Sequence, residues 1–304
     1  MQIGLIGLGK MGGNMARRLR AGNIAVIGFD RSAATTAALA TETGLLAADS
    51  AADLIKRLPA PRVVWLMLPA GPITAATVNE LAALLSPGDV LVDGANSFYR
   101  DSLTRGDLLA DQGLEFVDAG VSGGVWGLAE GYALMLGGSK TAIARLEPVL
   151  QVLAPAPERG WLHCGPVGAG HFVKMIHNGI EYGMMQAYAE GFALLESKKE
   201  FDLDLAAIAE MWRHGSVVRS WLLDLTADFL QADSALGDVA AYVADSGEGR
   251  WTAMEAIEQG IPAPVMSLAL MARFTSQGSS EYGNKMLAMM RQAFGGHGVK
   301  TSDP

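Results

Sequence analysis

The stretch that decides the fold lies at the start of the chain and reads "IGLIGLGKMGGNMARRL" (Ile3–Leu19). A short apolar run leads into a G-x-G-x-x-G pattern at Gly7, Gly9 and Gly12, and a helix is expected from Met11 to Arg20. Backbone amides and the positive end of the helix dipole would then face the same point, where a pyrophosphate can bind. The pattern predicts a dinucleotide site, and a glycine-rich turn without a ligand is the alternative.

Beyond this turn, runs rich in Val, Ile and Leu alternate with helical patterns as far as about residue 165. The runs are apolar on both faces and helical segments separate them, which is typical of right-handed βαβ crossovers and a parallel sheet covered on both sides. They read "IGLIG", "IAVIGF", "RVVWLML", "DVLVDGA", "EFVDAGV" and "YALMLGG". After "GPVGAG" (Gly165–Gly170) the pattern is helical only. We expect an α/β fold with a doubly wound Rossmann domain over residues 1–165, followed by an all-α domain over residues 166–304.

Composition excludes several classes of protein. The chain has 304 residues, of which 50% are apolar, so it can form two ordinary cores. Acidic residues outnumber basic ones by 32 to 23, which argues against a nucleic-acid or anionic-membrane partner. Neither a signal peptide nor an apolar run of about 18 residues is found, so we expect a soluble, cytoplasmic protein. The single cysteine, Cys164, forms no internal disulfide, and no zinc or other metal site is indicated.

The second expected strand ends at Asp30, close to the offset at which a carboxylate accepts both hydroxyls of an adenosine ribose. A carboxylate there repels a 2′-phosphate, which favours NAD over NADP. Asp30 could instead be the N-cap of the next helix, and Arg31 could attract the phosphate. We expect NAD to be the cofactor, with NADP used more weakly.

Two further segments should reach the carboxyl ends of the strands, where ligands of such folds bind. They are "DGANS" (Asp93–Ser97) and "DAGVSGGVWGLAEG" (Asp118–Gly131). Ser122, Gly123 and Gly124 would bring a hydroxyl and backbone amides close to an anionic group of a substrate. A plain turn is the alternative.

The stretch "HFVKMIHNGIEYG" (His171–Gly183) carries an unusual helix face. At 3.6 residues per turn a single face bears five polar groups among apolar neighbours: Lys174, His177, Asn178, Glu181 and Tyr182. Taken singly, each is more simply a solvated residue, a satisfied interior residue or half of a surface ion pair. Taken together and just past a nucleotide fold, they indicate a catalytic face.

These motifs together resemble the decarboxylating 6-phosphogluconate dehydrogenases, and "RWTAMEA" (Arg250–Ala256) and "RQAFGGHG" (Arg291–Gly298) add to the resemblance. The resemblance covers nearly the whole chain. Its first three motifs occur throughout the β-hydroxyacid dehydrogenase group, whereas "KMIHNGIEYG", "RWT" and "FGGH" are more specific. The chain is shorter than the common long form and is similar to the short-chain type.

The resemblance implies oxidation of 6-phosphogluconate to ribulose 5-phosphate and carbon dioxide. It makes Lys174 the group that accepts the hydroxyl proton and then stabilises the enolate, because burial favours a neutral amine. Glu181 becomes the general acid, Asn178 and His177 hold the substrate and the lysine in register, and Tyr182 reaches the phosphate.

The remaining site residues follow from the same resemblance. Further substrate contacts are assigned to Asn96, Ser122, Gly123, Gly124, Arg250, Thr252, Arg273, Arg291 and His297. Cofactor contacts are assigned to Gly7, Leu8, Gly9, Lys10, Met11, Gly12, Asp30, Arg31, Ser32, Leu68, Pro69 and Asn96. The resemblance implies a homodimer or homotetramer, with the tail that carries Arg291 and His297 entering a second subunit. The chain departs from the family at Asp30, at Arg250, where a lysine is usual, and at Val125 and Trp126, where acidic residues are frequent.

Two other functions fit parts of the pattern. A β-hydroxyacid dehydrogenase acting on a small acid such as 3-hydroxyisobutyrate would keep Ser122, Gly123, Gly124, Lys174 and Asn178 without a phosphate site. A non-catalytic nucleotide-binding module would need neither Lys174 nor Glu181, and their presence argues against it.

Overall fold

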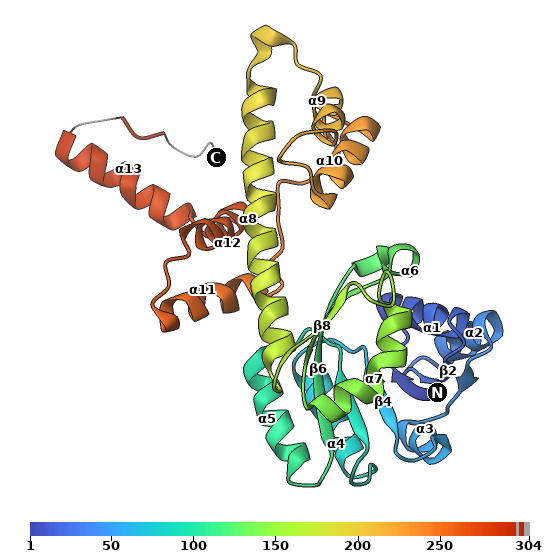
Figure 1. Cartoon of the computed structure of the whole chain (residues 1–304). Coiled ribbons are helices and arrows are strands. Elements are labelled where there is room, and N and C mark those ends of the chain that lie inside the picture. The colour runs from blue at the N-terminus through green and yellow to red at the C-terminus, as the bar shows by residue number, and fades with distance from the viewer. Residues whose placement is uncertain (296–297, 301–304) are drawn as a thin grey trace. The chain divides into compact units, whose positions relative to one another are not determined.

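The computed structural model describes residues 1–295 and 298–300. It divides into two compact units, Met1–His177 and Asn178–Pro304. The first contains a sheet (Figure 1). Its strands lie in the order β3-β2-β1-β4-β5-β6-β7-β8. The expected fold class, a doubly wound α/β domain followed by a helical region, is confirmed. The boundary between residues 165 and 166 stays a prediction.

The elements of the first unit alternate as the sequence pattern predicts. Its strands are β1 (Gln2–Ile6), β2 (Ala25–Phe29), β3 (Leu46–Ala47), β4 (Val63–Leu66), β5 (Val90–Asp93), β6 (Glu115–Ser122), β7 (Ala133–Gly137) and β8 (Trp161–Gly165). Its helices are α1 (Lys10–Ala21), α2 (Ala33–Thr43), α3 (Ala51–Arg57), α4 (Pro72–Ala82), α5 (Tyr99–Ala110), the 3₁₀ turn η1 (Gly124–Trp126), α6 (Gly127–Glu130) and α7 (Lys140–Leu153).

The expectation of a wholly parallel sheet is wrong at one pair, because β6 and β7 are antiparallel. The segment between them, residues 123–132, is shorter than the dozen or so residues that a parallel crossover needs. Two strands were also missed by the sequence pattern. β3 has only two residues, and β8 reads "WLHCG", which is not a Val- or Ile-rich run.

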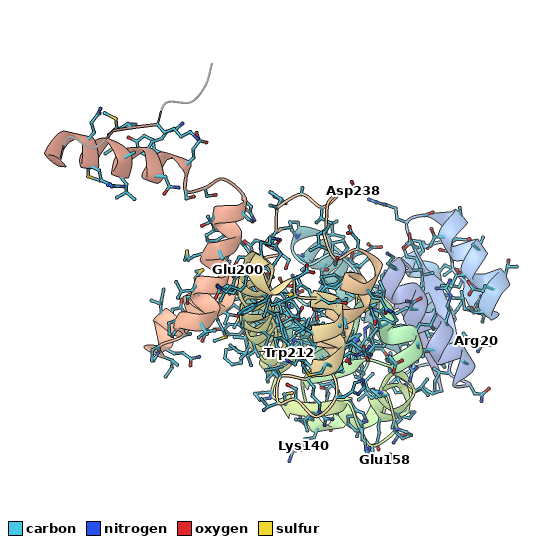
Figure 2. The ribbon with its side chains drawn as sticks, turned by 90° about the horizontal axis from the view of Figure 1, so that it is seen from above. Arg20, Lys140, Glu158, Glu200, Trp212 and Asp238 are labelled. Carbon is cyan, nitrogen blue, oxygen red and sulfur yellow. The ribbon has the colours of Figure 1, made fainter. Side chains whose placement is uncertain are left out.

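Two apolar clusters cover the two faces of the sheet. Successive side chains of a strand point to opposite faces, and Ile3 and Leu5 of β1 belong to one cluster while Ile6 belongs to the other. Charged side chains such as Lys140, at the start of α7, lie outside this core (Figure 2). Burial on both faces explains why these strands read as continuous apolar runs.

The helix α8 (Ala169–Ser197) begins in the first unit and continues into the second. Its 29 residues correspond to about 43 Å of helix. The second unit continues with η2 (Lys199–Phe201), α9 (Leu205–Trp212), α10 (Trp221–Ala232), α11 (Glu248–Gln259), α12 (Pro264–Ser276) and α13 (Glu281–Gly295). Among its described residues, the buried hydrophobic side chains are Tyr182, Ala209, Leu223, Ala227, Leu230, Ala269 and Leu270. This core is small for a unit of that length.

Candidate active site

The glycine turn after β1 has the geometry that close approach of a pyrophosphate requires. A Cβ at Gly12 would lie 1.9 Å from the carbonyl oxygen of Gly7, so only glycine fits there. At Gly9, by contrast, the space that a Cβ would enter is open, and no side chain caps the helix α1. The residues of this turn therefore fit the pyrophosphate of a dinucleotide.

Asp30 holds the glycine turn from the end of β2. Its Oδ2 accepts a hydrogen bond from the backbone N–H of Leu8 at 2.8 Å, and its Oδ1 accepts one from Ser32 N–H at 2.8 Å. The alternative role of Asp30 as an N-cap is wrong, because Ser32 caps α2 through the N–H of Thr35. Each carboxylate oxygen can accept a second hydrogen bond, so the side chain can still receive ribose hydroxyls.

Asn96 joins the ends of two neighbouring strands. Its Oδ1 accepts from the N–H of Val121 at 2.8 Å, and its Nδ2 donates to the carbonyl of Val121 at 3.0 Å. The backbone of Asn96 has a positive φ of 53°, which asparagine tolerates better than most residues. This paired bond fixes the "DGANS" loop beside the segment that carries Ser122.

A buried ion pair supports the same loop. Asp93 is fully buried and its Oδ2 accepts from Arg105 Nη1 at 2.7 Å and from Ser97 Oγ at 2.9 Å. Its Oδ1 accepts from the N–H of Ala95 at 3.0 Å. All these partners lie within one loop and the helix that follows it, so the network fixes the conformation of residues 93–97.

Alternate residues of β6 position the start of α8. Asp118 accepts hydrogen bonds from the N–H groups of Gly168, at 2.6 Å, and His171, at 2.7 Å. Two residues further along, a Cβ at Gly120 would lie 2.4 Å from the Cβ of Lys174. The absence of a side chain at Gly120 lets the lysine stem lie directly on the strand.

Lys174 is only 6% exposed, and its amine lies beside a histidine of the same helix. Its Nζ lies 3.5 Å from Nδ1 of His177, and Nε2 of that histidine lies 3.5 Å from Oγ of Ser122. One turn earlier on α8, His171 is buried and its Nδ1 lies 2.7 Å from Oγ of Ser102. The structure thus brings together Ser122, His177 and Lys174, which the sequence placed in two separate motifs.

Burial raises the pKa of the Asp118 carboxyl, and the nearby His171 and its backbone hydrogen bonds oppose that rise. An acid with a raised pKa holds its proton more tightly in the folded protein than in the unfolded chain. Its contribution to the free energy of unfolding is therefore fully present below its ordinary pKa of 3.8 and is lost as pH rises through the raised value.

We expect Asp118→Asn to lower the free energy of unfolding by about 1–3 kcal/mol at neutral pH. An amide presents one oxygen and one NH₂ group, so one of the two N–H groups at the start of α8 loses its acceptor. Urea unfolding measures the change, and Asp107→Asn, on the exposed face of α5, is the control. Equal stability of wild type and Asp118→Asn would mean that these hydrogen bonds do not anchor α8.

In the second unit, aromatic rings and arginines form a cluster of contacts. The guanidinium of Arg273 lies 3.4 Å from the ring centre of Tyr182, and that of Arg250 lies 4.4 Å from the ring centre of Phe274. The hydroxyl of Tyr182 lies 3.1 Å from Oγ of Ser246. This cluster offers two permanent cations and two hydroxyls to an anion.

The other predicted substrate residues have varied surroundings. Gly123 and Gly124 both have positive φ and lead into η1, while Asn178 and Glu181 are half-buried on α8. Thr252 is buried and donates its hydroxyl to the carbonyl of Glu248. Arg291 is exposed on α13, and His297 lies outside the described residues.

The predicted cofactor residues that remain lie along the strand ends. Lys10 and Arg31 are exposed, Met11 and Leu68 pack against the core clusters, and Pro69 accepts from Thr74 Oγ1 at its carbonyl. Sequence reasoning assigned no role to Asp93, Ser102, Arg105, Asp118, His171, Asp245 or Ser246. For Asp118 a signal existed, since residues 118, 120 and 122 share one face of a strand.

Comparisons with known proteins identify the family of the chain. A family model described as the NAD-binding domain of 6-phosphogluconate dehydrogenase matches residues 2–165, and one described as the 6-phosphogluconate dehydrogenase C-terminal domain matches residues 170–294. The chain belongs to the 6-phosphogluconate dehydrogenase family. Its resemblance to that family in sequence is thereby confirmed.

Relatives in this family include both coenzyme types. A Haloferax volcanii protein named as the NAD(+)-dependent, decarboxylating 6-phosphogluconate dehydrogenase is 42% identical over 304 residues, which is 100% of each chain. The Bacillus subtilis protein named as NADP(+)-dependent is 35% identical over 287 residues, 90% of this chain and 61% of that one. The structure of Plasmodium falciparum 6-phosphogluconate dehydrogenase matches 100% of this chain and 67% of its own, with 28% identity and a TM-score of 0.84.

The described part of the chain has neither a membrane-spanning helix nor a metal-binding cluster. No helix in it is both long and apolar enough to cross a membrane. Residues 1–295 and 298–300 also contain no group of three or more His, Cys, Asp or Glu side chains that could bind a metal ion.

Proposed function

We propose that this chain oxidises 6-phospho-D-gluconate to D-ribulose 5-phosphate and carbon dioxide, with NAD as the hydride acceptor. The observation that carries the proposal is the match of both family models, together with 42% identity over its whole length to a relative named for this reaction with NAD. The buried amine of Lys174 lies beside His177, which in turn lies beside Ser122, and this supports the proposal further because the chemistry needs a base out of water.

The glycine turn and Asp30 would hold NAD, which would supply the acceptor for the hydride of the substrate carbon. Nζ of Lys174 accepts the proton of the substrate hydroxyl as that carbon becomes a carbonyl. When the carbon–carboxylate bond breaks, the electron pair moves to the carbonyl oxygen, and Lys174 returns a proton to it. Glu181 then protonates the carbon that lost the carboxylate, and Lys174 takes back the hydroxyl proton.

The remaining residues bind and orient in this proposal. Asn96, Ser122, Gly123, Gly124, His177 and Asn178 hold the carboxylate and hydroxyl end of the substrate. The phosphate end is bound by Tyr182, Arg250, Thr252, Arg273, Arg291 and His297. Residues 1–165 are the NAD-binding domain, and residues 166–304 form a helical domain for substrate binding and oligomerisation. A cytoplasmic location completes the proposal.

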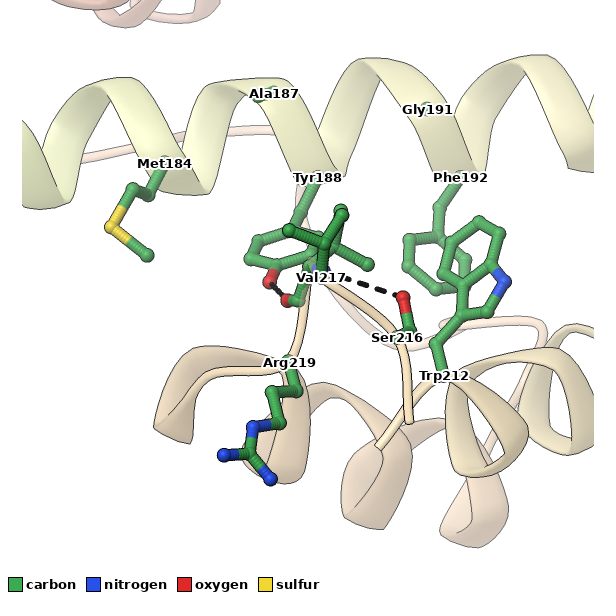
Figure 3. Close-up of a pocket in the computed structure, with 10 residues that line it drawn as sticks. Met184, Ala187, Tyr188, Gly191, Phe192, Trp212, Ser216, Val217 and Arg219 are labelled. Atoms are coloured by element: carbon green, nitrogen blue, oxygen red, sulfur yellow. Dashed lines mark hydrogen bonds between the residues drawn. The ribbon is translucent and has the colours of Figure 1, made fainter. Parts of the chain in front are cut away.

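A homodimer or homotetramer is part of the proposal because the second unit leaves much apolar surface uncovered. Side chains from α8, from the end of α9 and from the segment that follows it line an apolar cavity of about 630 Å³ (Figure 3). Val217, in its lining, is 98% exposed. On α13 the side chains of Tyr282, Met286, Leu287, Met289 and Met290 are all exposed. Apolar surface of this extent is typical of subunit interfaces.

The assay that tests the reaction compares NAD reduction with 6-phosphogluconate and with unphosphorylated hydroxy acids, including 3-hydroxyisobutyrate. Turnover of 6-phosphogluconate with release of carbon dioxide is expected. Faster turnover of a small unphosphorylated acid would replace the proposal with the β-hydroxyacid dehydrogenase alternative. No turnover of any acid would favour a non-catalytic module.

For the cofactor, we expect Asp30→Asn to lower the ratio of kcat/KM for NAD to that for NADP about tenfold. Removing one charge beside the ribose changes the relative free energies by on the order of 1–2 kcal/mol. Initial rates with both coenzymes measure the ratio, and Asp49→Asn, at an exposed aspartate, is the control. An equal loss with both coenzymes would show that the bond to Leu8, rather than the charge, is the main role of Asp30.

A further inference from the structure

Arg250 is held on two sides by its own unit. Its guanidinium lies over the ring of Phe274, and its Nε donates to Oδ2 of Asp245. Among the described residues, no acceptor bonds Nη1 or Nη2, and the side chain is 54% exposed. The contacts therefore fix the plane of the guanidinium while leaving its terminal nitrogens to an outside ligand.

Asp245 is the fixed member of this pair. Its side chain is only 5% exposed, and its Oδ1 accepts from the N–H of Gly247 at 3.0 Å. One carboxylate oxygen is thus bound to the backbone at the start of α11, and the other faces Nε of Arg250. Because this carboxylate is buried and accepts two hydrogen bonds, it fixes the orientation of the arginine, whose side chain is longer and more mobile.

The segment that carries Asp245 also contacts the second cation. Arg273 Nη1 donates to the carbonyl of Ala244 at 2.8 Å, and Ser246 Oγ bonds the hydroxyl of Tyr182. Three consecutive residues therefore contact Arg273, Arg250 and Tyr182 in turn. A phosphate dianion is recognised best by guanidinium groups that present two parallel N–H donors, and that requires a fixed plane.

We propose that Asp245 is a positioning residue for the phosphate end of the substrate, which holds Arg250 by Nε so that Nη1 and Nη2 face the phosphate. This inference rests on the proposed function and adds Asp245 to the residues that determine specificity for a phosphorylated substrate. A carboxylate near a phosphate would otherwise oppose binding. If Asp245 positions Arg250, its removal should raise KM; if its charge mainly repels the phosphate, its removal should lower KM. The direction of the change in KM therefore decides between the two roles.

The experiment is a double-mutant cycle on the full chain, with the variants Asp245→Ala, Arg250→Ala and both together. Asp245→Ala should raise KM for 6-phosphogluconate about tenfold and change kcat less than about twofold. In the Arg250→Ala background it should raise KM no further, because Asp245 acts through that arginine. kcat/KM for unphosphorylated gluconate should stay unchanged.

Asp204→Ala is the matched control for a weakened helix start. Asp204 caps α9 of the same unit by accepting from Ala207 N–H, and among the described residues it forms no ion pair with an arginine. Asp204→Ala should lower thermal stability by about as much as Asp245→Ala does, without changing KM.

Three results would overturn the role of Asp245: an unchanged or lowered KM in Asp245→Ala, additive effects in the double variant, or an equal rise in Asp204→Ala. Each of these can occur in an enzyme whose wild type turns over 6-phosphogluconate. Failure of the wild type to use that substrate would instead reject the proposed function, so the two failures are distinguishable.

Discussion

Replacing Lys174 by methionine should lower kcat for 6-phosphogluconate by about 10³-fold or more, since the amine serves both as base and as stabiliser of the enolate oxygen. Methionine keeps an unbranched stem, so the contact with Gly120 can persist while the amine is lost. Steady-state rates with saturating NAD and substrate measure the effect. Because chemistry is removed rather than binding, KM should change much less than kcat.

The matched control for this variant is Lys140→Met, which removes an exposed ammonium from the start of α7. Its turnover should equal that of the wild type. The free energy of unfolding should also be higher for Lys174→Met than for Lys140→Met, because methionine at the buried position 174 removes a polar group from the interior. Intact turnover in Lys174→Met would show that another group takes the proton, and the assignment of the base would be wrong.

The fold could be predicted from the sequence wherever one residue pattern repeats over a whole element. Runs such as "RVVWLML" are apolar at every position because both faces of β4 are buried, and this marks a parallel sheet. The antiparallel direction of β7 and the two-residue strand β3 could not be predicted in the same way. β7 is equally apolar, so only the length of the preceding connection shows its direction.

For the candidate site, the sequence showed groups that share one helix or one loop. Lys174 and His177 are three residues apart, so helical spacing alone predicts that they are neighbours. Asp118 was harder to assign, since its partners lie 50 and 53 residues away and no local pattern connects them. Asp245 was missed for a different reason, since an acidic residue near an arginine usually forms a surface pair, and only burial shows otherwise.

Arg105→Met should lower the free energy of unfolding by about 3–5 kcal/mol, the largest change in stability that we expect from one side chain. The variant leaves the carboxylate of Asp93 fully buried without its counter-charge, and Ser97 Oγ also loses a donor. Urea unfolding followed by circular dichroism measures it, with the transition of the first unit analysed separately if the two units unfold in steps.

Lys285→Met is the matched control, because it breaks an exposed ion pair instead of a buried one. Lys285 pairs with Glu281 on the exposed surface of α13, and a pair of that kind contributes about 0.5 kcal/mol or less. Adding Asp93→Asn to Arg105→Met should recover part of the lost stability, because an amide has no charge to leave uncompensated. If Arg105→Met cost no more than Lys285→Met, the buried pair would not hold the loop that carries Asn96. In that event the bond between Asn96 and Val121 would have to fix the loop on its own.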